Sequence, residues 1–266
     1  MDLGLEGRRA VVTGGSRGIG RAVARKLAAE GVRVAICART RGPLEAAAAA
    51  IAEETGAEVL PLVADVQDPG AVEAFVATAA ERFGGLEVVV NSAARVSGSG
   101  VPEDLEHVSD ETILGDFEEK FLGALRTTRA ALPHLRSAGW GRVVNVSGLT
   151  ARVAGSVSAG ARNAALVHLT RTMSVALGRD GITVNAIYPA LTVTEGLEER
   201  LAARAEREGT TAQQLLTDLS QNSAIGRLVT ADEIADVVVF LASERSAGIT
   251  GEAIAVSGGT GSSVSY

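Results

Sequence analysis

A glycine-rich turn near the start of the chain has the residue types that bind a pyrophosphate. Gly14, Gly18 and Gly20 lie within the segment 13–20, between an apolar run and an amphipathic one. Gly14 can adopt a backbone shape that a Cβ disfavours, Gly18 allows close approach to a phosphate, and Gly20 allows tight helix packing. The N-terminus of the following helix offers N–H groups and a positive dipole end. Because the spacing is not G-x-G-x-x-G, an ordinary strand-to-helix turn is the alternative reading.

The elements that must position this turn alternate along the chain. Helical patterns separate short, largely β-branched runs at 32–37, 59–63, 86–90, 141–147, 182–187 and 252–256. This alternation predicts a doubly wound α/β fold with a mainly parallel sheet and right-handed crossovers. Continuous apolar runs are typical of strands that helices cover on both faces. Without an internal repeat or linker, the 266 residues are expected to form a single domain, 1–266.

Composition and charge narrow the class of protein. The formal net charge is −7, whereas nucleic-acid binding requires a basic face, so no nucleic-acid partner is expected. No apolar run is long enough to span a bilayer, and the N-terminus is too acidic for a signal peptide, so no membrane partner is expected. Cys37 is the single cysteine, and no spacing of histidines, cysteines or carboxylates indicates a metal site. These features predict a cytoplasmic protein.

Several motifs in order resemble those of the short-chain dehydrogenase/reductase family over nearly the whole chain. They are the TGxxxGxG-like turn at 13–20, the pair Asp65-Val66, the NNAG-like segment Asn91-Ser92-Ala93-Ala94, and Pro189 with Thr194 in a P-G-x-x-x-T-like loop. Ala190 replaces the glycine of that loop. The resemblance implies a seven-stranded Rossmann sheet and a bound nicotinamide dinucleotide. The cofactor residues it implies are Gly14, Ser16, Arg17, Gly18, Ile19, Gly20, Arg39, Asp65, Val66, Asn91, Ala93 and Thr194.

The end of the second strand indicates which dinucleotide binds. In NAD sites an acidic residue at this point accepts hydrogen bonds from the ribose hydroxyls. Here the strand ends Cys37-Ala38-Arg39, without an acid. Arg39 and Arg17 can pair with a 2′-phosphate, because a guanidinium binds phosphate oxygens in bidentate fashion. NADP(H) is therefore favoured over NAD(H).

The catalytic positions depart from the family pattern. The resemblance implies a Ser, a Tyr-x-x-x-Lys pair on one helix face and an Asn on the preceding long helix. Aligning the segment 163–166 with the Lys-Ala-Ala-Leu run of the family places Ala159 at the tyrosine and Asn163 at the lysine position. Lys120 falls at the asparagine position, and either Ser147 or Gly148 holds the serine position. A tyrosine–lysine pair would exchange a proton as hydride moves, and this chain lacks it.

Three functions remain open from the sequence. In the first, an NADP(H)-dependent oxidoreductase acts on a carbonyl or alcohol with Ser147, Lys120 from a long helix at 116–136, and Tyr188 as the replacement phenol. In the second, Lys120, Ser147 and Arg152 polarise a carbonyl in a non-redox isomerase, cyclase or dehydratase, with NADP structural. In the third, the protein senses NADP(H) without catalysis.

A polar helical segment at 195–220 resembles the substrate lid of the family and indicates a small-molecule substrate. The long helix and the helix that contains Ala159 commonly form subunit contacts in this family. The resemblance therefore implies a homo-oligomer, either a dimer or a tetramer.

Overall fold

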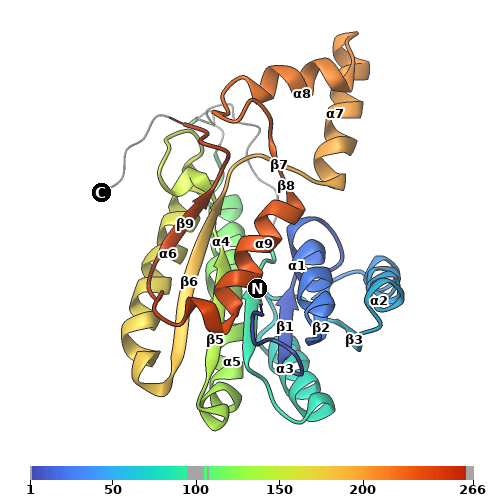
Figure 1. Cartoon of the computed structure of the whole chain (residues 1–266). Helices are drawn as coiled ribbons and strands as arrows, with labels where there is room; N and C mark the ends of the chain where they lie inside the picture. Colours follow the sequence, from blue (N-terminus) through green and yellow to red (C-terminus); the bar gives the residue numbers. More distant parts are fainter. Residues whose placement is uncertain (1, 95–104, 107, 262–266) are drawn as a thin grey trace.

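A seven-stranded sheet forms the centre of the computed structural model, which describes residues 2–94, 105–106 and 108–261. Its strand order is β3-β2-β1-β4-β5-β6-β9, and every neighbouring pair is parallel (Figure 1). The strands are β1 Arg9–Thr13, β2 Arg33–Ala38, β3 Val59–Val63, β4 Val88–Asn91, β5 Gly141–Val146, β6 Ile182–Pro189 and β9 Ala253–Val256. The predicted parallel α/β sheet is confirmed.

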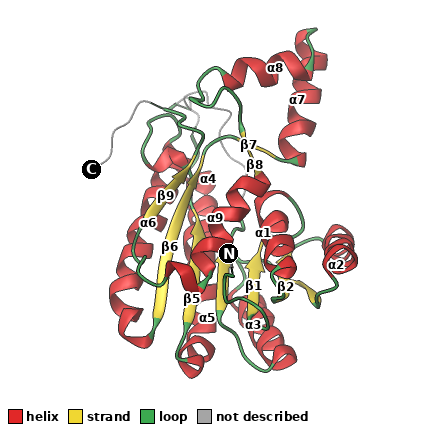
Figure 2. Ribbon diagram, in the orientation of Figure 1, coloured by secondary structure: helices red, strands yellow, loops and turns green. Residues whose placement is uncertain are grey.

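Helices cover both faces of this sheet (Figure 2). One core joins β-strand residues to α1, α2 and α9, and a second core joins them to α3, α5 and α6, with α4 packed against α6. The helices are α1 Gly18–Ala29, α2 Arg41–Thr55, α3 Pro69–Phe83, α4 Asp110–Phe117, α5 Gly123–Ala138, α6 Val157–Leu177, α7 Glu195–Glu208, α8 Ala212–Ser220 and α9 Ala231–Ala242. Within the described ranges, none of them combines the length and apolar composition needed to cross a bilayer.

The long helix that precedes β5 differs from the uniform helix expected over 116–136. Helical structure already begins at Asp110, and residues Glu118–Leu122 form a π-helical turn between α4 and α5. A π turn accommodates one extra residue and re-aims the side chains around it. Lys120 lies in this turn, so the departure from regular helix coincides with a predicted site residue.

The segment 195–220 consists of α7 and α8, which Figure 1 shows beyond the carboxyl ends of the strands. A short parallel pair, β7 Thr192–Val193 and β8 Val229–Thr230, forms the base of this segment. It has its own small apolar core, made of Leu197, Leu201, Ala205, Leu215 and Leu228. The two helices therefore pack on each other as a unit, and their role as a substrate lid stays a prediction.

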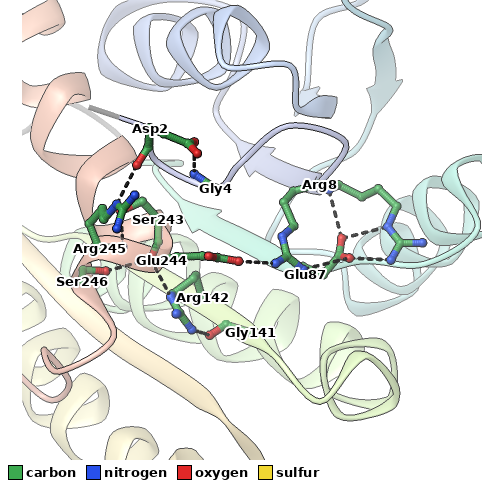
Figure 3. Close-up of polar contacts among 11 residues, drawn as sticks. Asp2, Gly4, Arg8, Glu87, Gly141, Arg142, Ser243, Glu244, Arg245 and Ser246 are labelled. Carbon is green, nitrogen blue, oxygen red and sulfur yellow. Dashed lines mark hydrogen bonds and ion pairs between the residues drawn. The ribbon is translucent and has the colours of Figure 1, made fainter.

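Glu87, just before β4, lies at the amino end of the sheet beside Arg8 (Figure 3). Its carboxylate accepts hydrogen bonds from the Arg9 backbone N–H at 3.0 Å and from the Arg9 guanidinium at 2.8 and 2.5 Å. Arg8 Nη1 lies 3.8 Å from the same carboxylate. Because Glu87 is only 5% exposed, its charge depends on these partners for stabilisation.

Replacing this carboxylate should destabilise the fold. We expect Glu87→Gln to lower the free energy of unfolding by about 1–3 kcal/mol, because Arg9 loses its charged partner in a largely buried setting. Urea denaturation followed by circular dichroism measures the change. The matched control is Glu58→Gln, which removes an exposed pair with Arg82 and should cost less than about 1 kcal/mol. Equal effects of the two substitutions would contradict the role assigned to Glu87.

Candidate active site

Gly14 and Gly20 occupy positions where a side chain does not fit, and Gly18 has a left-handed backbone conformation that favours glycine. Gly14 has a φ of 72°, and a Cβ there would lie 2.9 Å from Ala93 Cα. A Cβ on Gly20 would lie 2.2 Å from the Gly14 carbonyl oxygen. Gly18 begins α1 with a φ of 58°. The turn is thus packed against both its own helix and the end of β4, as a close phosphate-binding turn requires.

Thr13 links this turn to the next strand of the sheet. Its Oγ1 accepts hydrogen bonds from the N–H groups of Ser92 and Ala93, each at 3.1 Å. The NNAG-like segment therefore lies directly beside the glycine turn. Asn91, the first residue of this segment, has a buried side chain. Its Nδ2 donates to Asn145 Oδ1 at 2.8 Å and to Thr128 Oγ1 at 3.1 Å. Asn91 positions the strand ends, and a direct contact with the cofactor stays a prediction.

The N-terminus of α1 lacks the side-chain cap that most helices here have. Arg17 precedes the helix in extended conformation and its side chain makes no capping bond. By contrast, Asp68, Ser109, Ser156, Thr194, Thr211 and Thr230 cap α3, α4, α6, α7, α8 and α9. An N-terminus with N–H groups not used by a local cap is suited to an anion. Together with the three glycines, it fits a dinucleotide pyrophosphate.

The remaining predicted cofactor residues surround this turn. Arg17 and Arg39 are exposed, and Arg39 Nη1 lies 3.8 Å from the buried carboxylate of Glu119. Asp65 accepts the Gln67 N–H at 3.0 Å, and Val66 is buried next to it. Ser16 and Ile19 are half-buried in the turn, as is Thr194 at the start of α7. The pairing of Arg17 and Arg39 with a 2′-phosphate stays a prediction.

Lys120 is buried near the carboxyl end of β5. Its Nζ donates a 2.9 Å hydrogen bond to the carbonyl oxygen of Ser147, directly after β5. Burial, together with the Arg162 guanidinium, lowers the pKa of the Lys120 ammonium to about 7, against the opposing effects of Asp116 and Glu119. The structure thus brings Lys120 and Ser147 together, with an amine that can gain or lose a proton near neutral pH.

A buried ion pair, which the sequence interpretation missed, lies next to Lys120. Arg162 Nη1 is 3.1 Å from Asp116 Oδ1, and both side chains are almost fully buried. Ser158 Oγ donates to Asp116 Oδ2 at 2.5 Å. The available signal was the position of Arg162, three residues after Ala159 and therefore on the same helix face. A buried arginine on that face requires an acidic partner.

Asn163 and Thr150 form a second polar group that was missed. Asn163 Nδ2 donates to Thr150 Oγ1 at 2.7 Å, and a Cβ on Gly148 would lie 2.5 Å from that nitrogen. The Asn163 amide therefore fills the space beside Gly148. Thr150 Oγ1 in turn lies 3.3 Å from the carbonyl oxygen of Ala159. The pair supplies neutral hydrogen-bonding groups where the family resemblance implies a serine, a tyrosine and a lysine.

The two predicted hydroxyl groups are both engaged in packing. Ser147 Oγ donates to the backbone carbonyl of Asn163 at 3.0 Å, so a substrate must compete with the α6 backbone for this hydrogen bond. Tyr188 is 4% exposed, and its ring lies under the Arg152 guanidinium at 4.2 Å. Across the described residues, no hydrogen bond joins Tyr188 to Lys120 or Ser147. The catalytic roles of Ser147 and Tyr188 stay predictions.

Comparison with known proteins agrees with this fold and site. A family model described as Enoyl-(Acyl carrier protein) reductase matches residues 14–261. The short-chain reductase protein NovJ of Streptomyces niveus is 38% identical over 253 residues, covering 94% of this chain and 92% of NovJ. The chain therefore belongs to the short-chain dehydrogenase/reductase family.

Two further relatives support this assignment over the full length. The monensin polyketide synthase putative ketoacyl reductase of Streptomyces virginiae is 36% identical over 260 residues, covering 96% of this chain and 97% of the relative. The crystal structure of L-sorbose reductase from Gluconobacter frateurii, complexed with NADPH and L-sorbose, superposes with a TM-score of 0.92. It is 30% identical and covers 99% of this chain and 100% of the reductase.

The buried amine predicts a specific pH dependence of stability. The pKa of Lys120 is lowered in the folded state, from 10.5 to about 7, so the unfolded chain binds more protons between these values. Stability therefore rises with pH in that window, and the cost of burying the ammonium is largest below it. We expect Lys120→Met to stabilise most at about pH 6, with the gain shrinking by up to about 1.4 kcal/mol per pH unit above pH ~7.

Urea denaturation of both proteins between about pH 6 and pH 9 measures this difference. Lys26→Met, at the other lysine of the chain and on the surface of α1, controls for the loss of a lysine charge. A stability difference between Lys120→Met and the parent that does not change with pH would show that Lys120 does not titrate in this range.

Proposed function

We propose that this protein is an NADP(H)-dependent oxidoreductase that acts on a carbonyl or alcohol carbon of a small molecule. The observation that carries the proposal is the phosphate turn, where Gly14 and Gly20 leave no room for a side chain and α1 begins without a local cap. Similarity to a reductase crystallised with NADPH, and to ketoacyl reductases, supports the cofactor and the reaction class.

The reaction side would work without a tyrosine–lysine pair. Bound NADPH would supply a hydride. Lys120 would hold or release a proton at Nζ, since burial brings its pKa close to neutral. Ser147, whose carbonyl oxygen fixes the Lys120 amine, and Tyr188 at the end of β6 remain the candidate hydroxyl donors. Thr150 adds a third hydroxyl, which the Asn163 amide orients by donating to its oxygen.

A role without hydride transfer is the second candidate, because Ala159 and Asn163 provide no titratable group where the family resemblance implies two. Under this alternative, Lys120, Ser147 and Arg152 polarise a carbonyl in a non-redox reaction with NADP structural, or the protein senses NADP(H) without turnover. The same crevice and cofactor residues serve both candidates.

We also propose that the protein is a cytoplasmic homo-oligomer. The exposed face of α6 contains the small residues Ala161 and Ala164, and Val175 near its end is 74% exposed. Small side chains allow close helix packing between subunits. Light scattering coupled to size-exclusion chromatography measures the assembly.

Deuterium transfer separates the redox function from its alternative. NADPH deuterated at one face of C4, and separately NADPH deuterated at the other face, is incubated with the protein and a β-ketoacyl thioester or L-sorbose as probe. We expect deuterium at the carbinol carbon of the product. Lys120→Met should lower turnover at least about 100-fold, as loss of a proton-transfer group does, while dissociation constants for NADPH stay within about twofold. Lys26→Met is the matched control.

The outcomes of this experiment differ clearly. Conversion of a probe that leaves no deuterium in the product with both of the labelled cofactors would overturn the redox function. Full activity of Lys120→Met would return Lys120 to a structural role.

The choice of NADP(H) predicts a switch at Arg39. We expect Arg39→Asp to weaken NADPH binding by about 10- to 100-fold, because a charge-assisted bond to the 2′-phosphate is lost. NADH binding should strengthen, since a carboxylate can accept from the ribose hydroxyls. Fluorescence titration of both cofactors measures the two constants. Arg82→Asp, with the same charge change on α3, should leave them unchanged, and an unaltered NADPH constant for Arg39→Asp would contradict the assignment.

A further inference from the structure

A carboxylate from the α7–α8 segment lies on the N-terminus of α1. Glu195, the first residue of α7, accepts a 3.0 Å hydrogen bond at Oε2 from the Gly18 N–H. Its Oε1 lies 3.2 Å from Arg21 Nη1, one turn further along α1. These two bonds, called here the Glu195 contact, join segments that are 177 and 174 residues apart in the chain.

The Glu195 contact uses the N–H group on which the phosphate site depends. Gly18 is the residue at which α1 begins, and α1 has no cap from its own preceding side chain. A carboxylate resembles a phosphate in charge and in its oxygen acceptors, and both are attracted to the positive end of a helix. The carboxylate of Glu195 and the pyrophosphate of a dinucleotide therefore need the same donor.

The neighbouring contacts link this carboxylate to the position of the whole α7–α8 segment. A Cβ on Gly18 would lie 3.5 Å from the Thr194 methyl group, so the residue before Glu195 also lies against the turn. Thr194 caps α7 by accepting the Leu197 N–H at 3.3 Å. The carboxylate therefore belongs to the first residue of a helix that packs with α8 around its own core, and its bond to Gly18 holds the start of α7 against the turn.

We propose that Glu195 occupies the phosphate turn in the cofactor-free protein, so that a dinucleotide must displace it and in doing so releases the start of α7. This inference rests on the proposed NADP(H) binding. It gives the α7–α8 segment two positions, one held by Glu195 and one adopted with cofactor bound. Because such coupling is reciprocal, weakening the Glu195 contact strengthens cofactor binding.

The strength of the Glu195 contact determines how much it weakens cofactor binding. The Arg21–Glu195 pair is half-exposed and therefore weak, whereas the charged hydrogen bond to Gly18 N–H at a helix N-terminus is the stronger part. If the Glu195-bound form accounts for about nine molecules in ten, the apparent dissociation constant of the cofactor is raised about tenfold.

The test compares Glu195→Gln with Glu198→Gln, which removes the same charge one turn away on the exposed face of α7. Calorimetric titration of the full chain with NADPH measures the dissociation constants. We expect Glu195→Gln to bind NADPH about five- to tenfold more tightly than the parent, and Glu198→Gln to bind as the parent does. Equal or weaker binding by Glu195→Gln would show that Glu195 does not compete with the cofactor.

Limited trypsin digestion gives a readout that needs no cofactor. Cleavage after Arg200, Arg204 or Arg207 reports how firmly α7 is held. Glu195→Gln should be cleaved faster than the parent without ligand, and NADPH should accelerate cleavage of the parent toward the rate of the variant. Unchanged cleavage of the variant would overturn the proposal.

The two proposals fail in different ways. If neither the parent protein nor Glu195→Gln binds NADPH or NADH, the proposed function fails. Inorganic pyrophosphate then serves as the probe of the glycine turn. Faster digestion of Glu195→Gln, together with tighter pyrophosphate binding, would still support displacement of Glu195 by an anion.

Discussion

The close approach of Gly20 to the Gly14 carbonyl is the constraint on which the cofactor side depends. A side chain at position 20 would come within 2.2 Å of that oxygen, so only glycine lets α1 begin this near to β1. The same turn leaves Gly14 against Ala93, while Thr13 binds the N–H groups that follow β4. Glycine geometry and the Thr13 hydroxyl thus bring two strand ends and one helix N-terminus close together, as a phosphate site requires.

The reaction side is built differently, from buried side chains. Lys120 on the π turn donates to the Ser147 carbonyl. The nearby Asp116–Arg162 pair joins α4 to α6. A buried ammonium is costly, and a neighbouring guanidinium adds to this cost. A buried group that destabilises the fold in this way is more typical of a functional site than of a site that only stabilises the fold.

Local patterns allowed the sheet and the glycine turn to be predicted, because each depends on neighbours in the chain. The family resemblance placed Lys120 at the position of a site residue; in the structure its Nζ donates to the Ser147 carbonyl directly after β5, and its catalytic role stays a prediction. The Glu195–Gly18 bond could not be predicted in this way, since no pattern relates residues 177 positions apart. Ser147 was predicted as a catalytic hydroxyl from its place in the sequence, which could not show that the hydroxyl donates to the backbone carbonyl of Asn163 at 3.0 Å.

The glycine turn and the buried side chains around Lys120 are separate parts of the structure, so the family fold is compatible with alanine at position 159 and asparagine at position 163. Exchanges at 159 and 163 leave the turn at 14–20 unaffected, because that turn depends on glycine geometry and on Thr13. Within α6, the Asn163 amide fills the space beside Gly148, and Arg162 finds its partner on α4. Asn163 and Arg162 are thus each accommodated by a local contact, while the neighbouring strands stay in register.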